Sequence, residues 1–142
     1  MTRHKYNFSK KGKSKAVFVD GTRTAFVKSC GVFEDCDALF LFSRVIDGML
    51  RKQSFDPFEI DEVVAGAVVP QTKNPNVARD AILSLGLPSH IHGYTTNRAC
   101  TSSMQTVADA VKTIHYGHNN IILAGGVEML SDVPIVLSLI HI

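Results

Sequence analysis

The stretch YTTNRACTSSMQ, residues 94–105, decides the fold, because it changes from a strand pattern to a helix pattern within a few residues. β-Branched and aromatic residues come first, Cys100 and small hydroxyl residues follow, and apolar residues then recur at a helical spacing. A strand that leads directly into a helix is the basic unit of an α/β protein. The stretch also places a lone cysteine at the junction, outside any obvious core or metal cluster.

The same alternation continues on both sides of this junction. Asp35 or Asp37 is a candidate N-cap of the first helix, and Asn76 is a candidate N-cap of the second. Gly86 and Gly117 stand where the second and third helices should end. The apolar face expected for the third helix is Met104, Val107, Ala108, Val111 and Ile114. The predicted strands are residues 16–19, 62–69, 92–98 and 120–124, and the predicted helices are residues 37–52, 77–85 and 101–116. The order βαβαβαβ predicts an α/β fold with a mixed, mostly parallel sheet and helices on both faces.

Composition excludes several classes of function. The chain of 142 residues is 45% hydrophobic and 20% charged, as is ordinary for a globular domain. Its net charge of +2 is uneven, because residues 1–15 hold six of the 15 basic residues and none of the 13 acidic ones. We expect residues 1–15 to be a solvated, disordered leader, and we expect no nucleic-acid partner because the rest of the chain shows no basic face. No apolar run is long enough for a membrane span.

The cysteines argue against a disulfide framework and against a metal centre. Cys30, Cys36 and Cys100 form an odd set without a C-x-x-C pair, which favours a reducing compartment. His90 and His92 share a spacing that a metal site could use, but they have no acidic or cysteine neighbour, so a solvated loop is the simpler interpretation. We therefore expect no metal.

Cys100 is the candidate catalytic nucleophile. Reactive groups in open α/β sheets gather where strands end and helices begin. The first turn of a helix offers N–H groups and the positive end of the helix dipole, which favour a thiolate and a developing oxyanion. A buried structural cysteine remains the competing interpretation. Other features are interpreted as structural. Gly125-Gly126 fits a tight turn or close backbone packing, residues 20–24 fit a turn, Arg79 fits a surface charge, and Met104 and Met129 fit core residues.

Taken together, three motifs carry a resemblance to a known family. NRACTSSMQ at residues 97–105 and AGGVEMLSDVPI at residues 124–135 resemble the N-terminal part of a thiolase, and DGTRT at residues 20–24 resembles the family's first turn, although Ala25 stands where many members have proline. The loop at residues 71–79 and the ending at residues 131–135 are most similar to the 3-ketoacyl-CoA thiolases of fatty-acid oxidation complexes. The similarity covers about residues 16–136, and the implied fold is an incomplete thiolase N-terminal domain.

The resemblance implies an acetyl-CoA C-acyltransferase. Cys100 would take the acyl group from a 3-ketoacyl-CoA, with its own backbone N–H in an oxyanion hole, and coenzyme A would be the co-substrate with no further cofactor. The other groups that the family uses, an activating His, a second Cys, and an Asn and His at the thioester oxygen, belong to its C-terminal half, so the 142-residue chain is expected to be inactive. Implied partners are acyl-CoA substrates, a homodimer or tetramer, and a hydratase/dehydrogenase α-subunit. The expected location is cytoplasmic, with mitochondrial as the alternative.

Alternatives stay open at this stage. An acetoacetyl-CoA-forming thiolase, a β-ketoacyl synthase, a sterol-carrier-type thiolase and an inert thiolase-like scaffold are the competing functions. The expected domains are a leader at residues 1–15, the incomplete domain at 16–130 and the start of a loop domain at 131–142. Residues 137–142, LSLIHI, leave the resemblance abruptly and fit the codons CTG TCT CTT ATA CAC ATC, a transposase adaptor used for sequencing libraries. We expect these residues to be a non-native tail, which the source DNA would test.

Overall fold

A computed structural model describes residues 14–53, 56–69, 71–133 and 135 of the chain. The expected leader at residues 1–15 and the expected tail at 137–142 lie almost wholly outside these residues. The elements along the chain are α1 (Ala38–Gln53), a short 3₁₀ helix (Pro57–Glu59), β1 (Glu62–Gly66), α2 (Val77–Ser84), β2 (His92–Thr96), α3 (Ser102–His115), β3 (Ile122–Gly126) and a second 3₁₀ helix (Leu130–Asp132).

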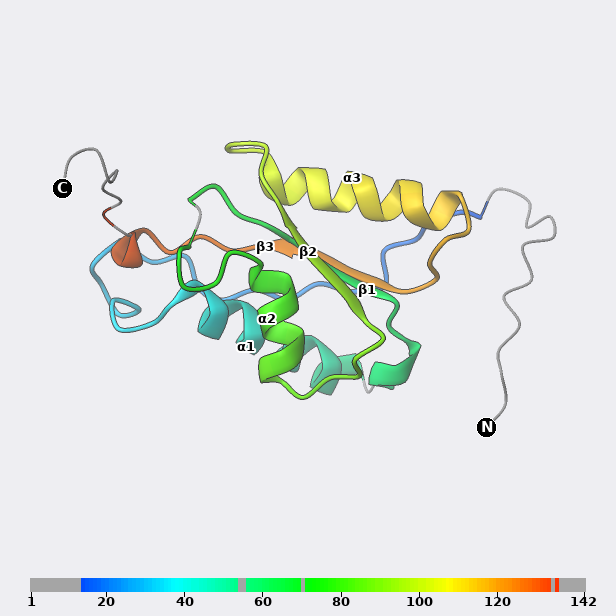
Figure 1. Ribbon diagram of the computed structural model, residues 1–142, viewed down its shortest axis with the longest axis horizontal. Coiled ribbons are helices and arrows are strands. Elements are labelled where there is room, and N and C mark those ends of the chain that lie inside the picture. The colour runs from blue at the N-terminus through cyan, green and yellow to red at the C-terminus, as the bar shows by residue number, and fades with distance from the viewer. Residues whose placement is uncertain (1–13, 54–55, 70, 134, 136–142) are drawn as a thin grey trace.

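The three strands form one parallel sheet in the order β2-β1-β3, with β1 in the centre. The last residue of β1, Gly66, is paired with Thr96 of β2 and with Gly126 of β3, so the three strands end at the same edge of the sheet. Figure 1 shows α1 and α2 on one face of the sheet and α3 on the other. The predicted α/β class, with parallel strands and helices on both faces, is confirmed.

The main core lies between the sheet and the face covered by α1 and α2. The central strand is buried from Val63 to Gly66, as its apolar sequence predicts for a parallel strand covered on both faces. The residues of this core are Phe42, Ile46, Ile60, Val63, Ala65, Val77, Ala78, Ala81, Ile82 and Ile91. This buried layer holds the sheet rigid, and the loops at the ends of the strands are built on it.

The predicted caps are confirmed. The Asp37 carboxylate accepts the N–H of Phe40 at 2.6 Å at the start of α1, and the Asn76 side chain accepts the N–H of Arg79 at 3.3 Å at the start of α2. Gly86 and Gly117 follow α2 and α3 with φ of 64° and 74°, the left-handed conformation that glycine adopts at helix ends.

The strand predicted at residues 16–19 is not formed, which corrects the expected strand order. Within the described part of the chain this segment has no regular structure, and Val17, Phe18 and Val19 are 70%, 82% and 68% exposed. The apolar pattern alone identified the segment, but a strand also needs a neighbour to which it can hydrogen-bond. The segment instead forms one wall of a groove that it shares with β3.

The predicted apolar face of α3 is also wrong in part. The side chains of α3 that are buried are Ser102, Thr106 and Ala110, one turn apart, whereas Met104 is 70% exposed. Small residues face the sheet because the helix packs very close to it, as described below. Met129 is buried, as predicted for a core residue. Arg79 is half-buried rather than a free surface charge, since its guanidinium donates to the Ile91 carbonyl at 2.8 Å.

Candidate active site

Cys100 lies between β2 and α3, where the chain makes a tight turn. Ala99, the residue before it, has a φ of 47°, a left-handed value that is uncommon for a residue with a side chain. The turn is closed by the N–H of Thr101, which donates to the Arg98 carbonyl at 3.1 Å, and by the N–H of Ser102, which donates to the Ala99 carbonyl at 3.1 Å. Cys100 itself is exposed and its thiol is free. The interpretation of Cys100 as a buried structural cysteine is therefore wrong.

The side chain of Ser102 stabilises the turn through hydrogen bonds. Its side chain is buried, its hydroxyl donates to the Ala99 carbonyl at 2.7 Å, and it accepts the N–H of Arg98 at 2.9 Å. The sequence indicated only that residues 101–103 are small enough for a substrate to approach. The structure shows that Ser102 is buried at the start of α3 and that its hydroxyl holds Arg98 and Ala99, the two residues before Cys100.

Two glycines allow α3 to begin so close to the sheet. A Cβ on Gly66 would lie 2.6 Å from the Ser103 nitrogen, and a Cβ on Gly126 would overlap the Ser103 hydroxyl and lie 2.8 Å from the Gly66 carbonyl oxygen. Side chains at either position would push the first turn of α3 outward. The reading of Gly126 as a position of close backbone packing is thus confirmed, and this packing sets the height of Cys100 above the sheet.

The loops after the three strands are tied together by two polar side chains. The Glu128 carboxylate, after β3, accepts the N–H of Val68 at 2.7 Å and that of Val69 at 3.2 Å, in the loop after β1. The Asn97 amide, after β2, donates to the Val68 carbonyl at 2.7 Å. Both residues stand in the motifs quoted above, but no role could be predicted for them, since their contacts join segments about 30 and 60 residues apart. Their position near the carboxyl ends of predicted strands was the available signal, since Asn97 lies at the end of the strand predicted at residues 92–98 and Glu128 lies shortly after the one predicted at 120–124.

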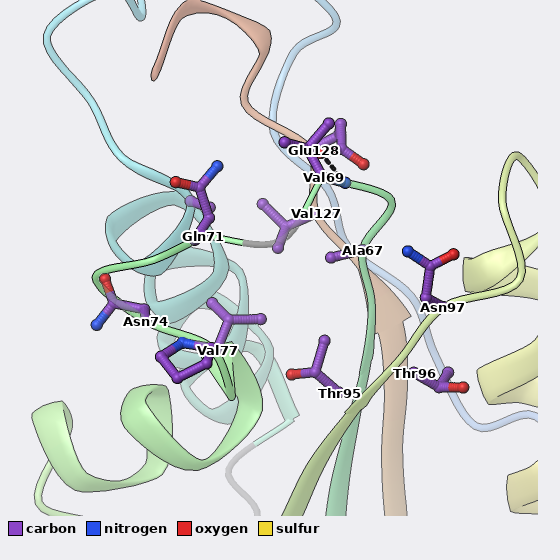
Figure 2. Close-up of a pocket in the computed structure, with 12 residues that line it drawn as sticks. Ala67, Val69, Gln71, Asn74, Val77, Thr95, Thr96, Asn97, Val127 and Glu128 are labelled. Carbon is purple, nitrogen blue, oxygen red and sulfur yellow. Dashed lines mark hydrogen bonds between the residues drawn. The ribbon is translucent and has the colours of Figure 1, made fainter. Parts of the chain in front are cut away.

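A small cavity of about 150 Å³ opens beside these loops (Figure 2). Its walls come from α1, α2 and the ends of the strands, and they include Gln71, Asn74, Thr95, Asn97 and Glu128. The Gln71 amide nitrogen is buried and has no hydrogen-bond partner among the described residues. Cys100 does not line this cavity, which is also smaller than the roughly 300–1,000 Å³ of typical ligand pockets. The candidate nucleophile therefore lies outside this cavity.

Two side chains of the sheet, Glu62 and Tyr94, have pKa values that burial raises. Burial raises the pKa of Glu62 at the start of β1, against the smaller opposing effects of His92 and an Asn119 hydrogen bond. Burial also raises the pKa of Tyr94 within β2, with a contribution from Asp109. Glu62 lies at the start of β1 and Tyr94 in the middle of β2, whereas the turn around Cys100 follows the end of β2.

The described residues hold no group of three His, Cys, Asp or Glu side chains that could bind a metal ion. His90 and His92 are exposed, and the His90 ring stacks on Phe58 with centroids 6.0 Å apart. None of the described helices is long and apolar enough to cross a bilayer.

Comparison with known proteins gives a consistent result. Residues 16–141 match the family described as thiolase, N-terminal domain. The chain is 38% identical over 127 residues to a probable 3-ketoacyl-CoA thiolase of Caenorhabditis elegans, covering 89% of this chain and 28% of the relative. It is 34% identical over 134 residues to the mitochondrial trifunctional enzyme subunit beta of Bos taurus, covering 94% of this chain and 28% of the relative.

The structural comparison agrees with the sequence comparison. The crystal structure of the Bacillus anthracis acetyl-CoA acetyltransferase superposes with a TM-score of 0.86 at 30% identity, over 89% of this chain and 32% of that one. The chain therefore spans less than a third of the length of these relatives. The match over residues 16–141 shows that this chain belongs to the thiolase family and corresponds to its N-terminal domain.

Proposed function

We propose that the protein to which this chain belongs is a 3-ketoacyl-CoA thiolase and that Cys100 is its nucleophile. The observation that carries the proposal is the exposed thiol of Cys100 on a strained turn at the start of α3, within a chain of thiolase sequence. A thiol in this position is accessible to a substrate and lies beside the N–H groups of a helix start.

The proposed reaction has two halves. The Cys100 sulfur forms a bond to the 3-keto carbon of the substrate, the bond between carbons 2 and 3 breaks, and the two-carbon unit leaves as acetyl-CoA after it gains a proton. The sulfur of free coenzyme A then attacks the thioester on Cys100 and releases a shortened acyl-CoA, and its proton replaces the one that the Cys100 thiol lost. The backbone N–H of Cys100 is the proposed donor to the negative oxygen of the intermediate.

Coenzyme A as co-substrate, without a further cofactor, follows from this chemistry. The name of the Bos taurus relative supports assembly with other subunits, and a hydratase/dehydrogenase α-subunit is the partner that we propose alongside self-association. The same name supports a mitochondrial location as the alternative to the cytoplasmic one that we propose.

The experiment uses the chain extended by the C-terminal part that the relatives possess. Cys100→Ala should lower CoA-dependent cleavage of a 3-ketoacyl-CoA by about 10³-fold or more, as removal of an essential nucleophile does. Cys30→Ala and Cys36→Ala are the matched controls and should retain most of the activity. Substantial cleavage by the Cys100→Ala enzyme would overturn the proposal.

A second candidate is an acetoacetyl-CoA-forming thiolase, favoured by the similarity to the Bacillus anthracis acetyl-CoA acetyltransferase. The same extended protein separates the two candidates. Faster cleavage of long-chain 3-ketoacyl-CoA than of acetoacetyl-CoA supports the first, and the reverse order supports the second.

A further inference from the structure

One peptide unit, between Val68 and Val69, is held from both sides. The N–H of Val69 donates to the Glu128 carboxylate at 3.2 Å, and the Val68 carbonyl of the same unit accepts from the Asn97 amide at 2.7 Å. The two groups of a trans peptide lie in one plane and point in opposite directions. Figure 2 shows Glu128 bonded to Val69 and the Asn97 side chain beside the same loop. A rigid plane thus connects a residue after β3 with a residue after β2.

Asn97 carries this connection on to the cysteine turn. Its side-chain oxygen accepts the N–H of Ala99 at 2.9 Å while its amide nitrogen donates to Val68. The two partners fix the orientation of the amide, because a carbonyl requires a donor and an N–H requires an acceptor. Ala99 is the left-handed residue directly before Cys100. The Asn97 bond therefore stabilises the backbone conformation that presents the thiol.

We propose that Glu128 and Asn97 are positioning residues for Cys100, acting in series through the Val68–Val69 peptide and Ala99. The inference rests on the proposed role of Cys100 as nucleophile. Glu128 orients the peptide, the peptide orients the Asn97 amide, and the amide holds Ala99 in the left-handed conformation. Neither side chain needs to touch a substrate.

The test measures the rate at which iodoacetamide alkylates Cys100 in the chain extended by the C-terminal part that the relatives possess. Mass spectrometry of the peptide that contains Cys100 follows the reaction, with Cys30 and Cys36 replaced by Ser. Glu128→Gln and Asn97→Ala should each lower this rate by about fivefold or more, and the double variant should fall little further, because groups in series are not additive. The rate falls because a freed turn takes the thiol away from the helix start, where an anion is favoured.

Two matched controls separate positioning from general damage. Glu59→Gln removes an exposed carboxylate, and Asn119→Ala removes an amide that donates to Glu62 at 2.8 Å at the far end of the sheet. Both should leave the Cys100 rate within about twofold of the parent. In an Ala99→Gly background the effect of Asn97→Ala should largely disappear, because glycine adopts the left-handed conformation without help.

The proposal is overturned if Glu128→Gln and Asn97→Ala leave the rate unchanged, or if Ala99→Gly does not reduce the effect of Asn97→Ala. It is also overturned if Cys100 and Cys30 are alkylated at the same rate in the unsubstituted chain, because the turn then has no effect on the reactivity of the Cys100 thiol. Alkylation of Cys100 does not require acyl transfer. The activity of the Cys100→Ala enzyme therefore tests only the proposed function, and the alkylation rates test only the positioning of Cys100.

Discussion

Ser102 packs directly on Gly66, so that a Cβ on Gly66 would lie 2.5 Å from the Ser102 carbonyl carbon. Gly66 ends the central strand and Ser102 begins α3, and the contact leaves no room for a methyl group between them. The atoms that would be struck belong to the helix backbone, which cannot rotate away as a side chain can. The start of α3, and with it the turn that carries Cys100, is therefore fixed by the absence of a side chain at residue 66.

Gly66→Ala should lower the free energy of unfolding by roughly 1–3 kcal/mol, the usual cost of overpacking. Urea denaturation followed by circular dichroism measures this change, and this and the other unfolding experiments use the chain extended by the C-terminal part that the relatives possess. Gly48→Ala is the matched control: a Cβ there meets nothing within 4 Å and the residue lies within α1, so this substitution should stabilise the chain by about 0.5–1 kcal/mol. Equal effects of the two substitutions would show that the contact at Gly66 carries no strain.

The hydroxyl of Thr106 should contribute to the same packing. Thr106 is fully buried, and its Oγ1 lies 2.7 Å from the Ser103 carbonyl oxygen and 3.0 Å from that of Gly125 on β3. Thr106→Val keeps the shape but removes the hydrogen bond to the half-buried Gly125 carbonyl, at a cost of about 0.5–1.5 kcal/mol.

Denaturation of the Thr106→Val chain is best compared with that of Thr113→Val. The Thr113 hydroxyl donates to the Asp109 carbonyl of its own helix, at 2.8 Å, and has no hydrogen bond to the sheet among the residues that the structure describes. Its loss should change the free energy of unfolding by no more than about 0.5 kcal/mol. If both variants unfold at the same urea concentration, the hydroxyl of Thr106 does not link α3 to the sheet.

The sequence was sufficient to predict the helices and the three parallel strands, because these depend on local signals. As predicted, Asn76 caps α2 and Gly86 ends it. The apolar run that begins after Glu62 forms the buried central strand of the sheet, also as predicted. Each of these features is decided by residues that are neighbours in the chain.

What could not be predicted depends on contacts between distant segments. The helical spacing of Met104, Val107 and Val111 indicated an apolar face for α3, but the two glycines of the sheet bring the small face of the helix inward instead. Residues 16–19 have a strand's composition, but composition does not reveal whether an edge is there to pair with. The roles of Asn97 and Glu128 likewise appear only when the loops after three strands are placed together.

The stability of the chain should depend on the ionisation of Glu62. Burial raises the pKa of this carboxyl, and Asp61 adds to the effect while His92 and Asn119 oppose it. A carboxyl whose pKa is raised in the folded state favours folding when protonated, so this contribution is present below the unfolded pKa of about 4.3 and is lost as the pH rises through the folded value.

Glu62→Gln should therefore flatten the fall in the free energy of unfolding as the pH rises above about 4.3. Denaturation midpoints from pH 4 upward, taken at about half-unit steps, measure the difference between the two chains. Glu59→Gln, at an exposed position, should keep the parent's slope. A Glu62→Gln chain with the parent's pH profile would mean that the carboxyl is equally solvated in both states.

The groove beside β3 should make the 142-residue chain poorly folded or prone to aggregation by itself. It has a volume of about 730 Å³ and lies between residues 15–29, β3 and the apolar faces of α1 and α3. Phe18 and Phe26, on its wall, are 82% and 93% exposed. Each large apolar side chain left uncovered forgoes roughly 1.5–3 kcal/mol, against a whole domain stability of about 5–15 kcal/mol.

Light scattering and the binding of a hydrophobic dye report this exposure, and a paired substitution locates it. Phe18→Ser should reduce both signals, because Phe18 lines the groove, whereas Phe58→Ser should reduce them less, although Phe58 is 72% exposed, because it lies outside the groove. The two substitutions remove the same side chain from similarly exposed positions, so the difference between them measures the groove itself. A soluble monomer that melts in one cooperative transition and binds no dye would contradict the prediction, because the side chains around the groove would then need no further cover.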